Sequence, residues 1–474
     1  MEMRATLEAQ RAAFGAALPE QLSVRRDRLR RAAAMVRDNA ERFCDALSED
    51  FGHRSREQSM LTDIAASIAP IAHALKHLER WARPERRAVQ FPLGLLGARA
   101  WVEYQPFGVV GVIAPWNFPV NLVMSPLAGV FAAGNRAMVK LSEYTPVTAA
   151  LFEEVVPRYF AADELAFVTG GAEVGEAFAG LPFDHLLFTG ATGVGRHVLR
   201  AAAENLTPVT LELGGKSPAI IGTGADLARA TERIAMGKMM NAGQICLAPD
   251  YVLAPAEREE AVADGVRAAV SRIYPTLLAN PDYTSIINDR HHQRLHDWLD
   301  DARAKGARVE VVNPAGEDFA GSNSRKMPLH IVRNVTDEMK LMREEIFGPV
   351  LPVVPYRGID NAIGYVNWGG RPLGLYYFGP DKAERRRVLD RTHSGGVTLD
   401  DVIFHNAMED LPFGGIGGSG MGAYHGRDGF RTFSHARAVY RQARVDVAKL
   451  AGLKPPYGKA TRASAMRQIG NKRS

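Results

Sequence analysis

Val109-Val-Gly-Val-Ile-Ala114 is the stretch from which the fold of this 474-residue chain is best predicted. A continuous apolar run of this length is typical of a parallel strand that is buried on both faces of its sheet. From Phe107 to about Leu213, further strand-like runs alternate with helix-like segments. This alternation predicts an α/β fold with a doubly wound parallel sheet, in which ligands bind where the strands end.

The elements around this first strand follow from the same patterns of apolar residues and turn residues. Thr145 is expected to be the N-cap of a helix whose first residue is Pro146. The expected strands cover residues 137–141, 165–168, 186–188 and 209–213, and the expected helices cover residues 122–133, 146–159 and 194–204.

The flanking segments have different patterns. Residues 1–80 are expected to be helical, and residues 88–104 predict two short strands around a glycine-containing turn, a hairpin suited to pairing with another subunit. A second α/β region is expected over residues 214–420, followed by a final helix-prone segment. The strands expected in this second region cover residues 219–221, 251–253, 350–354 and 396–399.

Composition places the chain among soluble proteins of two or three domains. It is 46% hydrophobic and 23% charged, and two cysteines in so long a chain exclude a disulfide framework and suit the cytoplasm. The N-terminus lacks the apolar segment of a signal peptide, and no apolar run reaches the roughly 18–20 residues of a membrane helix. We therefore expect a cytoplasmic protein with no membrane contact.

The net charge of +5 is a property of the C-terminal tail rather than of the whole chain. Residues 454–474 contain six lysines and arginines and no acid, so removing their +6 from +5 leaves −1 for the rest. A short basic tail is usually a solvated, disordered end. The charge therefore predicts no nucleic-acid partner.

The stretch Asn241-Ala-Gly-Gln-Ile-Cys-Leu-Ala-Pro249 contains one of the two cysteines. In a tight turn of small residues, a thiolate can be favoured electrostatically, and backbone N–H groups can hold an oxyanion formed by its attack. The alternative is a buried cysteine that acts as a small hydrophobic residue. We expect that structural role for Cys44, the other cysteine, which lies in an amphipathic N-terminal helix.

Polar residues follow several of the predicted strands. Glu212 ends one strand and is either paired structurally or poised as a base, whereas Asn117 either donates to an oxyanion or caps a turn. Phe188-Thr-Gly-Ala-Thr-Gly-Val-Gly195 follows a strand and opens a helix, which suits a phosphate, although a plain glycine-rich turn has the same pattern. Lys140 and Glu143 lie where a nucleotide ribose would be.

These stretches and Glu344-Glu-Ile-Phe-Gly-Pro-Val350, taken in order over nearly the whole chain, closely resemble the aldehyde dehydrogenase superfamily. The segments 241–251 and 411–426 resemble its class 3 branch, and the segments 133–143 and 181–190 are similar to bacterial coniferyl aldehyde dehydrogenases. The resemblance implies a cofactor domain (1–85 and 103–213), a catalytic domain (214–420), a small β bridging and oligomerisation element (86–102 and 430–450) and a basic tail (454–474). It also implies a homodimer.

The resemblance further implies roles for individual residues. Cys246 would be the nucleophile, Asn117 and the Cys246 N–H would hold the oxyanion, and Glu212 would activate water. No metal ligands are implied, and the cofactor would be NAD, with NADP possible. Because the Glu143 carboxylate would repel a 2′-phosphate, we expect NAD to be preferred. The residues expected at the cofactor are Trp116, Lys140, Glu143, Gly190, Gly195, Glu345 and Phe347.

Two positions depart from the family pattern: Leu141 stands in place of a frequent proline, and Ala191 in place of a serine at the diphosphate turn. The function implied is oxidation of an aldehyde, aromatic like coniferyl aldehyde, to its acid. The alternatives are a medium-chain or fatty aldehyde dehydrogenase of the same branch, an acylating enzyme that uses coenzyme A, and an inactive binding protein. Candidates for the substrate tunnel are Trp116, Met124, Phe404 and Tyr424.

Overall fold

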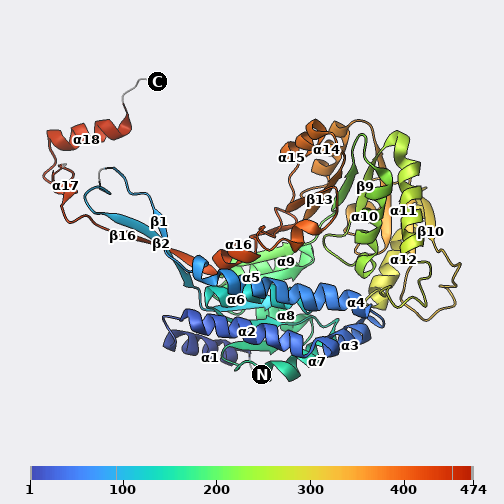
Figure 1. The fold of residues 1–474 in the computed structure, drawn as a ribbon, viewed down its shortest axis with the longest axis horizontal. Helices are drawn as coiled ribbons and strands as arrows, with labels where there is room; N and C mark the ends of the chain where they lie inside the picture. Colours follow the sequence, from blue (N-terminus) through green and yellow to red (C-terminus); the bar gives the residue numbers. More distant parts are fainter. Residues whose placement is uncertain (1–2, 92, 451, 471–474) are drawn as a thin grey trace.

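The computed structural model describes residues 3–91, 93–450 and 452–470. Two α/β units, each a β-sheet with its covering helices, lie next to each other and are called the first and second layers (Figure 1). A narrow β arm extends away from them. In the first layer, the strands run in the order β15-β7-β6-β3-β4-β5, and all neighbours are parallel except the edge strand β15. These strands are β3 (Val109–Ile113), β4 (Arg136–Lys140), β5 (Leu165–Val168), β6 (His185–Gly190), β7 (Val209–Leu213) and β15 (Gly420–Met421).

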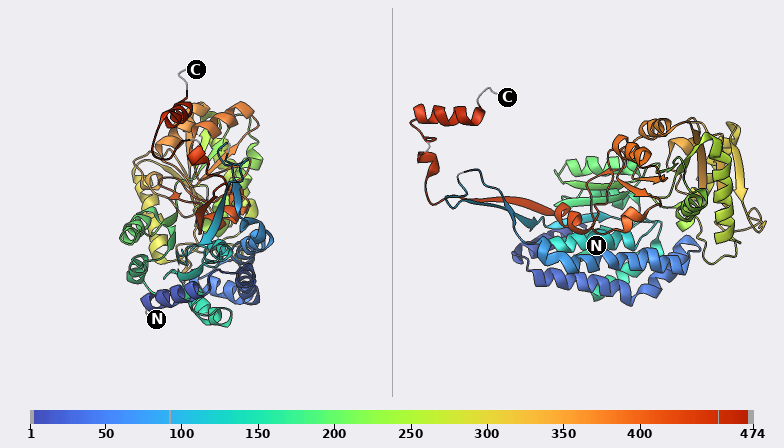
Figure 2. Two further views of the ribbon diagram at one scale, coloured as in Figure 1. Left: turned by 90° about the vertical axis from the view of Figure 1, so that its left-hand side faces the viewer. Right: turned by 45° about the horizontal axis from the view of Figure 1, so that its top comes forward.

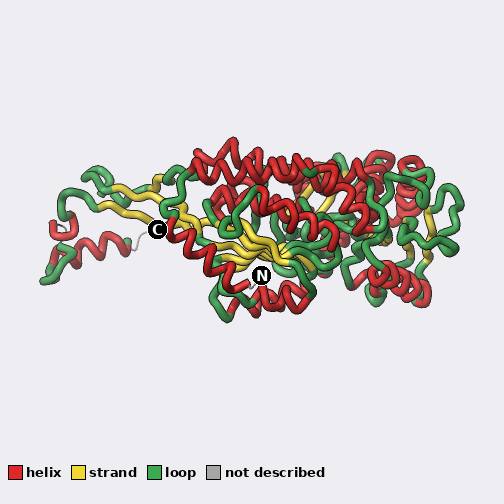
Figure 3. The backbone as a smooth tube through the Cα atoms, turned by 90° about the horizontal axis from the view of Figure 1, so that it is seen from below, coloured by secondary structure: helices red, strands yellow, loops and turns green. Residues whose placement is uncertain are grey.

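Helices cover both faces of this sheet (Figure 3). Val110 and Val112 point into a core with one set of helices, whereas Val109 and Ile113 point into a second core with the other set. The doubly wound prediction is therefore confirmed. The first set is α2 (Leu22–Asp38), α3 (Ala40–Phe51), α5 (Ala66–Trp81), α6 (Asn121–Ala133) and α7 (Pro146–Val155); the second is α1 (Met3–Ala16), α8 (Ala172–Ala179) and α9 (Thr192–Ala203).

The N-terminus of α7 corrects one detail of the prediction. Thr145 occupies the N-cap position, but its side chain makes no capping hydrogen bond. The Asp50 carboxylate caps instead, accepting from the N–H groups of Val147 and Thr148 at 2.8 and 2.9 Å. A carboxylate can accept both bonds at once and favours the positive end of the helix, so the cap also ties α3 to α7.

The second layer has seven strands in the order β10-β11-β12-β9-β8-β13-β14, of which only β10 is antiparallel to its neighbour. Three of its strands (β10, β11 and β13) have no counterpart among the four predicted from the sequence. The strands are β8 (Pro218–Ile221), β9 (Tyr251–Pro255), β10 (Arg308–Val312), β11 (Leu329–Arg333), β12 (Val350–Tyr356), β13 (Gly374–Phe378) and β14 (Gly396–Leu399). Its helices are α10 (Leu227–Met239), α11 (Glu259–Ile273), α12 (Asp289–Ala304), α13 (Lys340–Arg343), α14 (Ile359–Trp368) and α15 (Lys382–Arg391).

The arm is a three-stranded antiparallel sheet in the order β1-β2-β16 that projects from the body (Figure 2). Its strands are β1 (Glu85–Arg87), β2 (Arg99–Pro106) and β16 (Ser434–Arg441), and α16 (Gly426–Thr432) precedes β16. A hairpin is present, but β1 lies entirely before the segment 88–104 in which both strands were predicted, so only β2 overlaps the prediction. The boundary predicted at residue 103 falls inside β2.

Beyond the arm, the chain forms α17 (Val447–Leu450) and α18 (Lys459–Ile469). None of the residues of α18 is buried. The expectation of a disordered tail is wrong for these residues, because the segment is rich in alanine, a good helix former. Among the described residues, no helix is both long and apolar enough to cross a membrane.

Candidate active site

The Cys246 loop begins with an unusual turn. Asn241, Ala242 and Gly243 in the short helix η3 (Met240–Gly243) all have left-handed backbone angles, with φ of 49°, 51° and 74°. A Cβ on Gly243 would lie 2.5 Å from the carbonyl oxygen of Gly348, so only glycine fits there. The tight turn predicted from the small residues is present. It carries Ile245 and Leu247, which follow a helix of the second layer, into the core of the first layer.

Cys246 is half-buried at the junction of the two layers. Burial, followed by the nearby carboxyls of Glu345 and Glu212, raises the pKa of its thiol. The backbone N–H groups of Cys246 and Leu247 interact with the sulfur and oppose this shift, but they do not outweigh it. The resting structure therefore favours the neutral thiol, since desolvation outweighs the backbone interactions that can favour a thiolate.

Glu212 lies near the end of β7, and its side chain is 3% exposed. Within the described part of the chain, neither of its carboxyl oxygens has a hydrogen-bond partner. Burial raises the pKa of this carboxyl well above its ordinary value. Of the two alternatives from the sequence, an unpartnered carboxyl with a raised pKa fits a poised base rather than a structural ion pair.

Asn117 follows β3 and lies against the Cys246 loop. Its side-chain Nδ2 donates to the Gln244 carbonyl at 3.1 Å, which uses one of its two N–H bonds and leaves the other for a second acceptor. The backbone carbonyl of Asn117 accepts from Arg54 Nη1 at 2.8 Å and from Asn241 Nδ2 at 3.2 Å. Asn117 is thus held through both its side chain and its backbone.

Arg54 belongs to a buried ion pair that the sequence did not reveal. Its Nη2 lies 2.6 Å from Asp63 Oδ2, and both side chains are fully buried. Asp63 lies in the π-helix η1 (Met60–Ala65), just after α4 (Arg56–Ser59), and its Oδ1 accepts from the N–H groups of Val120 and Asn121. The pair therefore anchors both ends of the 117–121 segment. Charged residues in an amphipathic helical region gave no signal of this role.

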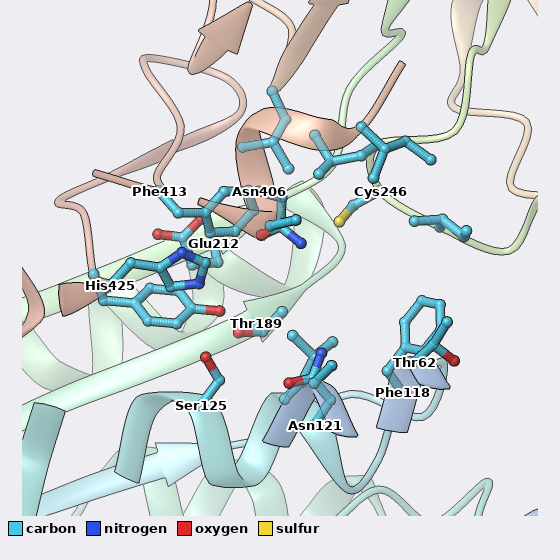
Figure 4. A pocket seen from close by; sticks show the side chains of 18 of the residues that line it. Thr62, Phe118, Asn121, Ser125, Thr189, Glu212, Cys246, Asn406, Phe413 and His425 are labelled. Atoms are coloured by element: carbon cyan, nitrogen blue, oxygen red, sulfur yellow. The ribbon is translucent and has the colours of Figure 1, made fainter. Parts of the chain in front are cut away.

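Cys246 and Glu212 line one cavity of about 270 Å³ (Figure 4). Of the four tunnel candidates, only Tyr424 lines it; Met124 is in the core, Phe404 is 57% exposed, and Trp116 packs near Phe347. The sequence reasoning missed most of the other walls. Apolar lining residues include Phe118, Leu122, Ile245, Leu373, Ile403 and Phe413, and polar ones include Thr62, Asn121, Ser125, Asn406, Glu409 and His425.

The residues expected at the cofactor lie at the carboxyl ends of the first sheet. Lys140 ends β4, and its Nζ lies 3.2 Å from Glu143 Oε2, which is 40% exposed as a side chain. Gly190 ends β6, and Gly195 lies in α9, where a Cβ would be 2.7 Å from the Leu213 side chain. Gly195 therefore lets α9 pack closely on β7.

The same sheet edge offers features that fit a dinucleotide. The strand order reverses between β3 and β6, the place where such sheets bind nucleotides. No side chain caps the N-terminus of α9, so its N–H groups can face a phosphate. Ala191, in the place of a frequent serine, provides no hydroxyl there.

Glu345 and Phe347 reach this region from the second layer. Burial and Asp250 raise the pKa of Glu345 to about 8, and its Oε1 has no hydrogen-bond partner among the described residues. Lys216 Nζ donates to the Glu344 carbonyl at 3.0 Å, and the Ile346 N–H donates to Asp250 at 2.9 Å. The loop is thus fixed on both sides of an orphaned carboxyl oxygen, which fits a cofactor hydroxyl.

These shifts predict how turnover depends on pH. Cys246 and Glu212 are both weaker acids than usual, so the thiolate and carboxylate forms accumulate only as the pH rises. We expect kcat/KM to increase between about pH 6 and pH 9.5, as measured in a constant-ionic-strength buffer series. A profile that is flat or falls over this range would contradict the raised pKa values.

Comparisons with known proteins agree with this geometry. The aldehyde dehydrogenase family matches residues 1–439. A probable coniferyl aldehyde dehydrogenase of Caulobacter vibrioides is 55% identical over 98% of this chain and 96% of its own, and the coniferyl aldehyde dehydrogenase of a Pseudomonas species is 54% identical over 93% and 91%.

Solved structures agree as well. The substrate-bound AldH of Staphylococcus aureus has a TM-score of 0.90 at 33% identity, covering 97% of this chain and 98% of its own. A Mycobacterium tuberculosis aldehyde dehydrogenase in complex with NAD+ has a TM-score of 0.81 at 29% identity, covering 93% and 90%. The chain therefore belongs to the aldehyde dehydrogenase family and is an oxidoreductase that acts on aldehydes with a nicotinamide dinucleotide cofactor.

Proposed function

We propose that this enzyme oxidises aromatic aldehydes of the coniferyl type to carboxylic acids. The observation that carries the proposal is a thiol and an unpartnered carboxyl in one largely apolar cavity. Its aromatic and aliphatic walls, such as Phe118, Leu122 and Phe413, suit a planar ring. Burial of a ring contributes about 25 cal/mol per Å², so it exceeds the burial of a methyl group by a few kcal/mol. The relatives named for coniferyl aldehyde support the same substrate class.

In this proposal, the Cys246 thiol gives its proton to solvent water, and the sulfur forms a bond to the aldehyde carbon while the C=O π bond breaks and its electron pair moves to oxygen. The resulting oxyanion accepts from the free N–H of Asn117 and from the Cys246 backbone N–H. A nicotinamide cofactor, when bound, would supply the acceptor for the aldehyde hydrogen and its electron pair, and Cys246 would then carry the acyl group as a thioester. Glu212 then takes a proton from water, whose oxygen attacks the thioester carbon. The C–S bond breaks, releasing the acid and the thiolate.

In this proposal the cofactor is held by Trp116, Lys140, Glu143, Gly190, Gly195, Glu345 and Phe347. Lys140 and Glu143 would hold the adenine ribose, and the half-exposed Glu143 carboxylate would disfavour a 2′-phosphate. NAD is then preferred, with NADP still accepted. Glu212 argues against transfer to coenzyme A, because a base that activates water would hydrolyse the thioester first.

The enzyme is proposed to act as a cytoplasmic homodimer. β16 is an edge strand whose residues are mostly exposed, and an unpaired edge of eight residues favours pairing with another chain. Residues 86–102 and 430–450 then form the bridging element, whereas residues 1–85 with 103–213 and residues 214–420 form the cofactor and catalytic domains. Both described cysteines are free, which suits a reducing compartment.

A substrate panel tests the proposal. We expect kcat/KM for coniferaldehyde and benzaldehyde to exceed that for acetaldehyde by at least about 10-fold, the value of roughly 1.4 kcal/mol of ring burial. The measurement follows NADH at 340 nm, and parallel assays with NADP should give lower specificity constants. If hexanal clearly exceeds both aromatic aldehydes, the enzyme is a medium-chain aldehyde dehydrogenase instead.

A further inference from the structure

One wall of the cavity contains polar groups that the proposed chemistry does not use. Phe413 and Tyr424 exchange backbone hydrogen bonds of 2.9 and 2.7 Å, which brings the chain around Glu409 against the segment 424–426. Gly426 is so close to the Glu409 carbonyl that an added Cβ would lie 2.2 Å from it. The backbone of Glu409 therefore lies beside the segment that carries His425, and both residues line the same cavity.

Both side chains have unpartnered atoms. Oε2 of Glu409 and Nδ1 of His425 are buried and have no hydrogen-bond partner in the part of the chain described by the structure, and both residues line the cavity. His425 is only 8% exposed, and its φ of 109° is unusual for a residue other than glycine. A buried polar atom without a hydrogen bond costs free energy, and so does a strained backbone. Both features at a cavity wall therefore point to a polar group on the ligand that pairs with these atoms.

The residues around Glu409 and His425 suit an aromatic ring of the ligand rather than an aliphatic chain. The His425 ring stacks on Phe413 at 5.1 Å and meets Tyr424 edge-on at 4.9 Å, which makes an aromatic wall. Small residues on the opposite helices, Ala69 and Ser125, leave room beside it. In Figure 4, His425 lies across the cavity from Cys246. An aldehyde carbon at the sulfur would therefore direct the far end of the substrate toward this wall.

We propose that Glu409 and His425 form a recognition site for a hydroxyl group on the ring of an aromatic aldehyde. This inference rests on the aromatic substrate class proposed above. The hydroxyl donates to the Glu409 carboxyl, and the neutral His425 ring can donate to the hydroxyl oxygen. Burial raises the pKa of Glu409 to about 7 and lowers that of His425 to about 4. Glu409 keeps an accepting oxygen in either protonation state. A site built this way discriminates strongly against an analogue without the hydroxyl.

The test compares 4-hydroxycinnamaldehyde with cinnamaldehyde and 4-methoxycinnamaldehyde, which cannot donate. We expect wild-type kcat/KM to favour the hydroxylated substrate about 10- to 100-fold. Glu409→Leu should abolish that ratio, the isosteric Glu409→Gln should reduce it, and Asp410→Asn should preserve it. Asp410 is the matched control, because its side chain is the next along the chain and is 76% exposed.

Two outcomes overturn the proposal. One is a hydroxyl ratio that is absent in the wild type or unchanged in both Glu409 variants. The other is an equal loss for all three substrates, since Glu409 would then act on the reaction and not on the ring. Melting temperatures of the variants identify folding defects, and Glu409→Gln decides the matter if Glu409→Leu is unstable. A preference for hexanal would contradict the proposed substrate class and leave the hydroxyl site untouched, because the hydroxyl ratio compares aromatic substrates only with one another.

Discussion

Replacement of Cys246 by alanine should lower kcat by at least about 10³- to 10⁴-fold, the scale seen when a covalent nucleophile is removed. The sulfur lies in the cavity beside two backbone N–H groups, and no other described cysteine lines that cavity. The variant should still bind NAD, because the residues proposed for the cofactor lie on other segments. Steady-state turnover with coniferaldehyde and NAD binding by fluorescence titration measure the two effects.

Cys44→Ala is the matched control for this experiment. Cys44 is 1% exposed within the core of the first layer, and burial raises the pKa of its thiol to about 11. Cys44 does not line the cavity that contains Cys246, so a substrate in that cavity cannot reach its thiol, and its loss should leave turnover within about twofold of the wild type. Substantial turnover in Cys246→Ala would contradict the nucleophile assignment.

Glu212→Gln should reduce steady-state turnover by about 10²-fold or more, because an amide cannot accept a proton from water. The chemistry before hydrolysis should survive, so a rapid burst of NADH, equal to one turnover per site, should precede the slow phase. Stopped-flow absorbance at 340 nm separates the phases. The exposed Glu204→Gln, beyond the end of α9, is the control and should show no such split.

Loss of the burst along with the steady rate would mean that Glu212 acts before the thioester forms. Because the Cys246 thiol has a raised pKa, it needs a base, and Glu212 could be that base. The burst rate in the same experiment tests this alternative. A base that withdraws the thiol proton would give a burst rate that falls in the variant. A base that serves hydrolysis alone would leave the burst rate unchanged.

The sequence predicted most strands of the first layer because they are short, largely apolar segments bounded by turn residues. The expected bounds of β5 and β7 match the structure residue for residue, as do those of β14 in the second layer. The strand β10, with Arg308 and Glu310 on an exposed edge, has a polar pattern that does not stand out. β13 was missed although Gly374-Leu-Tyr-Tyr-Phe378 is a short aromatic run flanked by Pro372 and by Gly379-Pro380, a pattern that indicates a strand.

The functional residues likewise fall into those that a local sequence pattern indicates and those that it does not. Local motifs indicated Cys246, Glu212 and Asn117, because each follows a strand or lies in a turn of small residues. The Arg54–Asp63 pair and the Glu409–His425 wall depend on contacts between segments distant in the chain, which no local pattern encodes. The desolvation of the Cys246 thiol could not be predicted for the same reason, since it is a property of the assembled cavity.

The thiol and the carboxyl come from different layers, and the Cys246 loop inserts Ile245 and Leu247 into the opposite core. Withdrawal of Ile245 and Leu247 from the first core would separate the thiol from the carboxyl while each layer stays folded. Local openings of this kind need less free energy than global unfolding. Heating should therefore inactivate the enzyme at temperatures where circular dichroism still reports intact helices. Residual activity then measures how much of the junction between the layers remains closed rather than how much of either layer remains folded.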